Sequence, residues 1–109
     1  MEIKSRIWIE KNGQPFLGYG RIKLLEAVYE TASISAAAKA LDMSYKKAWR
    51  LLKDINTKAL EPVLQKTIGG KNGGGTKVTD YGLMLIAQFQ RLNQNCMQYL
   101  EVEFKTINL

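Results

Sequence analysis

The sequence contains no histidine, and this absence removes several kinds of chemistry at once. Zinc sites that use imidazole, and nucleophile pairs such as Ser–His or Cys–His, cannot form without it. The single cysteine, Cys96, has no partner for an internal disulfide. Because the chain also lacks a recognisable cofactor loop, we expect no metal site and no cofactor, and the sequence predicts a protein that is not an enzyme.

Long apolar runs are absent as well. No stretch approaches the ~18 consecutive apolar residues that a membrane span requires. The N-terminal segment "MEIKSRIWIEK" alternates charged and apolar residues, unlike the continuous apolar segment of a signal peptide. With 109 residues, 46% hydrophobic and 24% charged, the chain has the size and composition of one soluble domain. We expect a cytoplasmic protein without a membrane partner.

Positive charge is concentrated in the middle third of the chain. The segment from Lys39 to Lys77 holds nine basic and three acidic residues, whereas the remainder holds seven of each, so the whole net charge of +6 lies in this segment. Such a local field suits a polyanionic partner. A solvated basic face without a partner is the alternative, and it accounts less well for the clustering.

A β-hairpin is predicted at the N-terminus, over residues 3–17. Apolar and polar residues alternate from residue 3 to residue 9, which is typical of a strand with one buried face. Asn12 and Gly13 then form the dipeptide that is most typical of a two-residue hairpin turn.

Three helices are expected next. Residues 20–32 have the apolar spacing of an amphipathic helix. A short helix follows with Ser35 as its expected N-cap, and a longer one begins at Ser44, because serine favours the first position of a helix. Residues 35–58 therefore match the helix-turn-helix plan, in which the second helix enters the major groove of DNA.

The longer helix carries an apolar stripe and a basic face. Residues at three- and four-residue spacing predict the core-facing stripe, namely Tyr45, Ala48, Trp49, Leu52 and Ile55. Within it we expect Trp49 to be packed, whereas Tyr45 could still reach a phosphate. The outward face is predicted to carry Lys46, Lys47, Arg50 and Lys53. Ser44 has two compatible roles, since an N-cap and a phosphate contact use the same geometry.

The stretch "GGKNGGG", residues 69–75, contains five of the nine glycines. A phosphate-binding loop would need Ser or Thr after Gly70-Lys71, but Asn72 stands there. The glycine spacing of a dinucleotide site is also missing. An interdomain linker is not expected, because the remaining segment is too short to form a second domain.

A hairpin tip explains these glycines better. Two short strands, at residues 63–67 and 76–79, flank the stretch directly after the basic helix, which predicts a wing over residues 62–79. Glycine allows a close approach to the sugar–phosphate backbone. Lys71 and Lys77 supply positive charge beside it. A loose turn would account for the glycines but not for the lysines.

A known family shares these motifs in the same order: "GRIKLLEAV", "SISAAAK", "SYKKAW", "GGKNGGG" and "VTDYGLMLI". The chain resembles the N-terminal domain of the ModE molybdate-responsive regulators, which are winged helix-turn-helix proteins of LysR-like type. The resemblance implies a dimeric domain that binds double-stranded DNA and regulates transcription. It places DNA contacts on Ser44, Tyr45, Lys46, Lys47, Arg50, Lys71 and Asn72.

Full-length members of that family continue into molybdate-binding domains, whereas this sequence ends at Leu109. We therefore do not expect molybdate sensing from these residues. A winged-helix module that binds proteins instead of DNA is the alternative. Such modules usually lose the basic excess around the recognition helix, which this chain retains.

A long final helix is predicted from residue 80 almost to the end. Steps of four and three residues give it the seam of a coiled-coil pair, formed by Leu85, Phe89, Leu92, Cys96 and Tyr99. A second apolar row consists of Ile86, Met97, Leu100 and Phe104. A single helix folded over its own core would also use an apolar stripe. Because two rows are present, we expect a homodimer, with residues 1–79 as the DNA-binding domain and residues 80–109 as the dimerisation helix.

Overall fold

The computed structural model describes residues 1–68 and 75–109. The described elements follow in the order β1 (Trp8–Lys11), β2 (Gln14–Gly18), α1 (Tyr19–Thr31), α2 (Ile34–Ala40), α3 (Tyr45–Lys58), β3 (Leu64–Lys66), β4 (Thr76–Val78) and α4 (Asp80–Phe104). Each pair of strands forms its own antiparallel sheet. The predicted class, mainly α with small β-hairpins in a winged helix-turn-helix, is confirmed.

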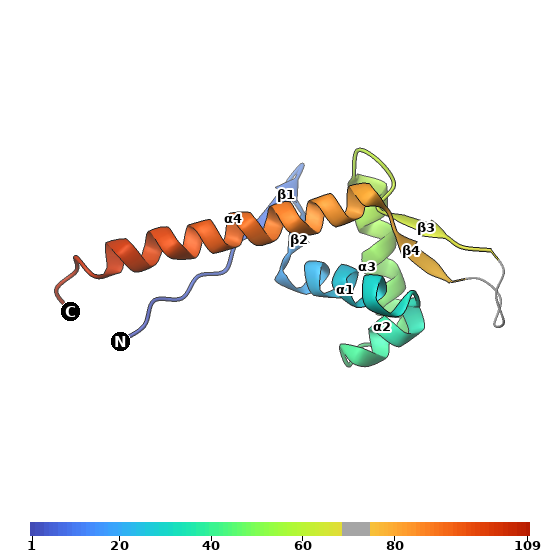
Figure 1. Cartoon of the computed structure of the whole chain (residues 1–109), viewed down its shortest axis with the longest axis horizontal. Coiled ribbons are helices and arrows are strands. Elements are labelled where there is room, and N and C mark those ends of the chain that lie inside the picture. Colours follow the sequence, from blue (N-terminus) through green and yellow to red (C-terminus); the bar gives the residue numbers. More distant parts are fainter. Residues whose placement is uncertain (69–74) are drawn as a thin grey trace.

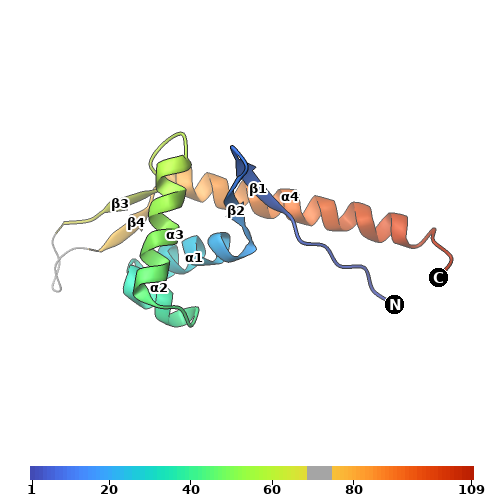
Figure 2. The same ribbon diagram turned by 180° about the vertical axis from the view of Figure 1, so that it is seen from behind.

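The molecule is elongated because α4 extends well beyond the other helices (Figure 1). Helices α1, α2 and α3 cluster at one end, and the wing strands β3 and β4 project from that cluster. Residues 1–7 run beside the distal half of α4, so both termini lie at the same end of the molecule (Figures 1 and 2). The principal extents are 60 × 27 × 22 Å.

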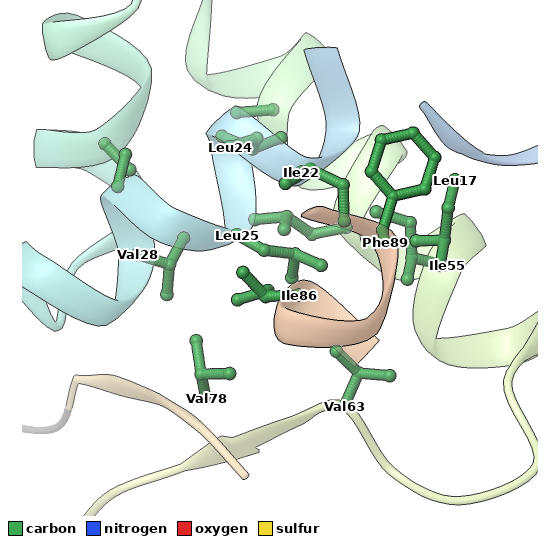
Figure 3. Close-up of a cluster of buried hydrophobic side chains, with 14 of the residues drawn as sticks. Leu17, Ile22, Leu24, Leu25, Val28, Ile55, Val63, Val78, Ile86 and Phe89 are labelled. Atoms are coloured by element: carbon green, nitrogen blue, oxygen red, sulfur yellow. The ribbon is translucent and has the colours of Figure 1, made fainter. Parts of the chain in front are cut away.

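The core lies where α1 meets α3, the wing strands and the first half of α4 (Figure 3). Fully buried side chains come from α1 and α3, and Ile86 and Phe89 of α4 close the cluster from another side. Burial of each large aliphatic side chain contributes about 1.5–3 kcal/mol. The predicted boundary between residues 79 and 80 falls inside this core, so the start of α4 belongs structurally to the winged helix.

The first turn of α4 packs tightly against the wing strands. Thr79 caps the helix by accepting a hydrogen bond from the Gly82 amide at 3.0 Å, and its hydroxyl donates to the Pro62 carbonyl at 2.6 Å. A Cβ at Gly82 would lie 2.7 Å from the carbonyl oxygen of Val63 and 2.7 Å from a methyl carbon of Val78. Glycine at this position therefore permits a contact that a larger residue would block.

The N-terminal hairpin is shorter than predicted, because β1 begins at Trp8 and not at residue 3. Trp8 pairs with Gly18, where β2 ends and α1 starts, so residues 1–7 have no strand to pair with. The turn is as predicted: Asn12 and Gly13 both have positive φ, 52° and 76°. This conformation is typical of the tight turns favoured in hairpins.

A charged cluster ties the hairpin and α1 to α3. Asp54 accepts hydrogen bonds from Arg21 at 2.6 Å and from Lys58 at 2.9 Å. Lys58 also donates to the Pro15 carbonyl, and Lys11 donates to the carbonyl of Lys58. The hydrogen bond from Arg21, followed by that from Lys58, lowers the pKa of the Asp54 carboxyl group. The acidic group on this flank of α3 is thus engaged by cations of the same chain.

Among the helices of the described residues, none is both long and apolar enough to cross a bilayer.

Candidate nucleic-acid interface

Helices α2 and α3 form the predicted helix-turn-helix, with a different cap on α2. The cap is Ser33, whose side chain accepts a hydrogen bond from the Ala36 amide at 3.1 Å; Ser35 lies inside the helix. The reason lies in the preceding turn, where Ala32 adopts a left-handed conformation and the Ser33 amide donates to the Thr31 hydroxyl. Because the chain changes direction at Ala32, α2 begins at Ile34 and Ser33 occupies the N-cap position.

Helix α3 begins as predicted. The Ser44 side chain caps it by accepting a hydrogen bond from the Lys47 amide at 3.1 Å. The helix is held against the domain by Ala48, Leu52 and Ile55, all of which are buried. These three members of the predicted stripe therefore fix which face of α3 points away from the core.

The outward face of α3 is basic. Lys46, Lys47 and Arg50 are exposed, and none of them belongs to an ion pair within residues 1–68 and 75–109. Their charges are consequently available to an external anion. The structure brings these three cations together within two turns of one helix, with Lys46 and Arg50 opposite the buried stripe and Lys47 on one flank.

Two aromatic members of the stripe are not buried, in contrast to the prediction for Trp49. Trp49 is 44% exposed and Tyr45 is 55% exposed. Both lie on the flank of α3 that faces the wing strands, where no other element of the described chain covers them. The ammonium group of Lys53 lies 4.8 Å from the centre of the Trp49 ring. Spacing alone could not separate this flank from the buried face, since Trp49 is only one residue away from Ala48.

The wing is present, with strands slightly shorter than predicted. Leu64 pairs with Val78, and Lys66 pairs with Thr76. Lys77 of β4 is exposed. The other two predicted wing contacts, Lys71 and Asn72, lie outside the described residues.

The wing strands contact the turn between α1 and α2 at the end where Lys66 pairs with Thr76. The Thr76 amide donates to the Ala32 carbonyl at 3.0 Å. Thr67 and Gly75 are joined by two hydrogen bonds, of 3.0 Å and 2.8 Å. A Cβ at Gly75 would lie 2.6 Å from the Ala32 carbonyl oxygen. These contacts fix the wing strands relative to the helix-turn-helix.

A groove separates α3 from the wing strands. We call it the wing groove; its volume is about 650 Å³ and its walls include Ser33, Tyr45, Trp49, Lys66, Thr67 and Thr76. A smaller continuation of about 280 Å³ is lined by Trp49, Lys53 and Lys66 among others. Lys53, Lys66 and the exposed indole were not among the predicted DNA contacts. The pairing of Trp49 with Lys53 four residues later is the sequence signal that could have indicated them.

The predicted dimer residues fall on different surfaces of α4. Phe89 is only 5% exposed and packs in the core of its own chain (Figure 3), so we remove it from the interface. Leu85 is half-buried against the same core. Leu92 and Tyr99 are 48% and 67% exposed, and Cys96 is half-buried beside them. The part of the predicted seam that is not packed in the core of its own chain is therefore its C-terminal half, from Leu92 to Tyr99.

The second apolar row of α4 is also engaged within the chain. Ile86 is buried in the core, and Met97 accepts a weak hydrogen bond from the Ser5 hydroxyl at 3.4 Å. Residues 1–7 run beside the distal half of α4 instead of extending the sheet (Figures 1 and 2), and Ser5 contacts Met97 there. The exposed stripe that remains on the other side of the helix consists of Met84, Leu92, Tyr99 and Val102.

The chain is similar to several known proteins. A 44% identity over 72 residues relates the chain to the molybdenum transport protein ModE of Azotobacter vinelandii, covering 66% of this chain and 27% of that protein. The molybdenum-pterin-binding protein MopB of Rhodobacter capsulatus is 38% identical over 85% of this chain and 34% of its own length. The DNA-binding transcriptional dual regulator ModE of Escherichia coli K12 is 38% identical over 68% of this chain and 28% of its own length.

The chain spans about a third or less of the length of these relatives. The family of bacterial regulatory helix-turn-helix proteins of lysR type matches residues 19–83, a range that runs from α1 through the helix-turn-helix and the wing strands into the first turn of α4. The chain therefore belongs to the lysR family of bacterial regulatory helix-turn-helix proteins.

Proposed function

We propose that this chain binds double-stranded DNA in a sequence-specific manner and acts as a transcriptional regulator of the ModE-like type. The observation that carries the proposal is the basic outward face of α3, where Lys46, Lys47 and Arg50 are exposed and unpaired within the described part of the chain. Membership of the lysR helix-turn-helix family supports it independently.

In this proposal α3 lies in the major groove. The N-terminal residues of a recognition helix are the ones that reach base edges, which suits Tyr45, Lys46 and Arg50. Ser44 and Lys47 lie at the start of the helix, where phosphate contacts are favoured. Lys77 on β4 adds a phosphate contact from the wing, and Lys71 and Asn72 are further proposed contacts from the part of the wing outside the described residues.

We further propose a homodimer that is held by the distal half of α4. Leu92, Cys96 and Tyr99 are its contact residues, with Leu85 at the edge. The proposal is supported by the exposed apolar stripe on a helix of 25 residues whose far half, within the described part of the chain, lies beside residues 1–7. A second copy would cover that stripe and place two recognition helices on one duplex.

DNA binding requires the protein to share a compartment with DNA, so we place it in the cytoplasm. Names of some relatives refer to molybdenum, but this chain covers only 27–34% of those proteins, and the partner that we propose for it is DNA. No enzymatic step forms part of the proposed function.

A winged-helix module for protein partners is the second candidate. The exposed Trp49 and Tyr45 would suit such a role, because aromatic residues are enriched in protein interfaces. The neighbouring cations favour DNA instead, since lysine is depleted at the centre of protein interfaces.

The salt dependence of duplex binding tests the proposal. Fluorescence anisotropy of a labelled random-sequence duplex, titrated with the protein at increasing salt, should give a steep fall in affinity. We expect a log–log slope of about −0.9 for each phosphate neutralised. The absence of binding at low salt, or binding that does not respond to salt, would refute the DNA-binding function.

A further inference from the structure

Trp49 is the largest side chain that the fold leaves exposed within the proposed DNA-binding face. It is 44% exposed and lines both the wing groove and its smaller continuation. Ala48 and Leu52, its neighbours on α3, are completely buried, so the exposed indole is not a consequence of a loosely packed helix. Exposed aromatic surface that lines a groove is characteristic of a binding site.

The position of the wing groove indicates which part of a nucleic acid would occupy it. This step rests on the proposed function. Suppose that α3 lies in the major groove of the DNA and that the wing strands contact the duplex beside it. The part of the DNA between α3 and the wing strands is then the ridge that separates the major groove from the neighbouring minor groove. In duplex DNA that ridge is the sugar–phosphate backbone of one strand. The wing groove lies between α3 and the wing strands, as this geometry requires.

The chemistry of the groove suits a sugar–phosphate chain. Lys53 and Lys66 supply positive charge, and no carboxylate belongs to the described residues that line either depression. The hydroxyl oxygens of Ser33 and Thr67 accept hydrogen bonds from backbone amides, which leaves each hydroxyl proton available to a phosphate oxygen. The face of the indole provides an apolar surface for a deoxyribose.

Lys53 links the apolar and charged parts of the groove. Its ammonium lies 4.8 Å from the centre of the Trp49 ring, within the range of a cation–π interaction. This contact holds the charge at the edge of the groove. A phosphate next to a sugar packed on Trp49 would meet a cation whose position is already restricted.

We propose that the wing groove and its continuation seat the backbone of one DNA strand, with Trp49 packed against a deoxyribose and with Lys53 and Lys66 contacting the adjacent phosphates. Trp49 is then a positioning contact that carries no sequence information. Contact with a base edge is the competing role for this side chain, and the two roles predict different effects on specificity.

Intrinsic fluorescence reports on Trp49 directly. The chain has two tryptophans, so in a Trp8→Phe variant Trp49 is the sole source of tryptophan fluorescence. Saturation with an unlabelled random-sequence duplex should lower the acrylamide quenching constant of Trp49 severalfold. Saturation is established in parallel by the anisotropy of the same duplex carrying a label. Unchanged quenching in a saturated complex would overturn the assignment of Trp49 while leaving the DNA-binding function intact.

Substitution separates backbone contact from base contact. Two duplexes are compared: one of random sequence, and one enriched from a random pool by binding to the protein. Trp49→Leu should weaken binding to both by the same factor. That factor should be roughly three- to tenfold, because the variant loses apolar contact area. Lys53→Gln should reduce the salt slope by about 0.9, the value for one phosphate contact. Tyr29→Leu is the matched control, since Tyr29 is an exposed aromatic residue that lines none of these depressions, and it should leave both affinities unchanged.

Three results would count against the inference. Loss of affinity for the selected duplex alone would assign Trp49 to base recognition, and unchanged affinity for both duplexes would remove it from the interface.

Circular dichroism melting of Trp49→Leu first establishes that the variant is folded, and the fluorescence measurement on Trp8→Phe does not depend on that variant. The third contrary result concerns the wild-type protein. If the wild-type protein binds no duplex, the proposed function itself fails, and this inference fails with it.

Discussion

Gly82 is the residue at which the packing of α4 against the wing strands can be tested with a single methyl group. Gly82→Ala would bring a Cβ within 2.7 Å of both the Val63 carbonyl oxygen and a Val78 methyl carbon. Relief requires a backbone shift, so we expect the free energy of unfolding to fall by roughly 1–3 kcal/mol despite the better helix propensity of alanine. Chemical denaturation followed by circular dichroism measures the change.

Gly20→Ala is the matched control for this experiment. Gly20 is also helical, but nothing lies within 4 Å of the position that its Cβ would occupy. We expect unchanged stability or a gain of up to about 1 kcal/mol from the helix preference of alanine. Equal stability losses in the two variants would mean that the close contact at Gly82 is not responsible.

Individual residues differ in how well the sequence predicted their roles. Ser44 could be identified as a cap because only one serine precedes the helix that it starts. For α2 two serines were available, and the left-handed turn at Ala32, which no local pattern indicates, selected Ser33 over Ser35. Trp49 satisfied the spacing of the buried stripe, yet its burial depends on whether another element covers that flank.

At the scale of elements, α3 and the wing are expected to contribute differently to DNA binding. Arg50→Ala should relax the preferred sequence, because an arginine contact with guanine contributes roughly 1–3 kcal/mol of discrimination. Lys77→Ala should weaken binding to all duplexes equally and reduce the salt slope by about 0.9, as expected for one phosphate contact. Competition titrations with selected and random duplexes at several salt concentrations measure both effects.

The control for these two variants is Lys105→Ala, which removes an exposed lysine at the far end of α4. It should leave affinity and preference unchanged. An Arg50→Ala protein that retains its full sequence preference would exclude Arg50 from base recognition, and a Lys105→Ala protein as weak as Lys77→Ala would mean that net charge alone governs binding.

Most elements could be predicted because their signals are local. Helical spacing, the serine cap of α3 and the asparagine–glycine turn each depend on residues close in sequence. The extent of the first strand is different, since it depends on how far its partner continues. β2 ends at Gly18 because α1 starts there, and residues 1–7 lie along α4 instead. The alternation of residues 3–9 could not reveal that limit.

At the scale of the whole molecule, the distal half of α4 is the proposed dimer contact. Leu92→Glu places a charge in the centre of the free apolar stripe, where a second copy would have to bury it at high cost. Because Leu92 is 48% exposed in the single chain, we expect the variant to remain folded and to sediment as a monomer at concentrations where the wild type is a dimer. Sedimentation velocity and circular dichroism provide the two measurements.

Gln94→Glu introduces the same charge at another exposed position of α4, and it should leave the association unchanged. A folded Leu92→Glu protein that still sediments as a dimer would place the interface elsewhere. Phe89 is unsuitable for this test, because a charge there would disrupt the core of the single chain.

Selection of bound fragments from a pool of random duplex DNA tests the central claim most directly. A two-fold symmetric dimer that reads bases through α3 should enrich an inverted repeat, with half-sites about one helical turn apart or a multiple of that distance. Enrichment should depend on Arg50 and should weaken as salt increases. A bound pool whose sequences are no different from the starting pool would contradict sequence-specific recognition, and enrichment of a single, unrepeated site would contradict the dimer.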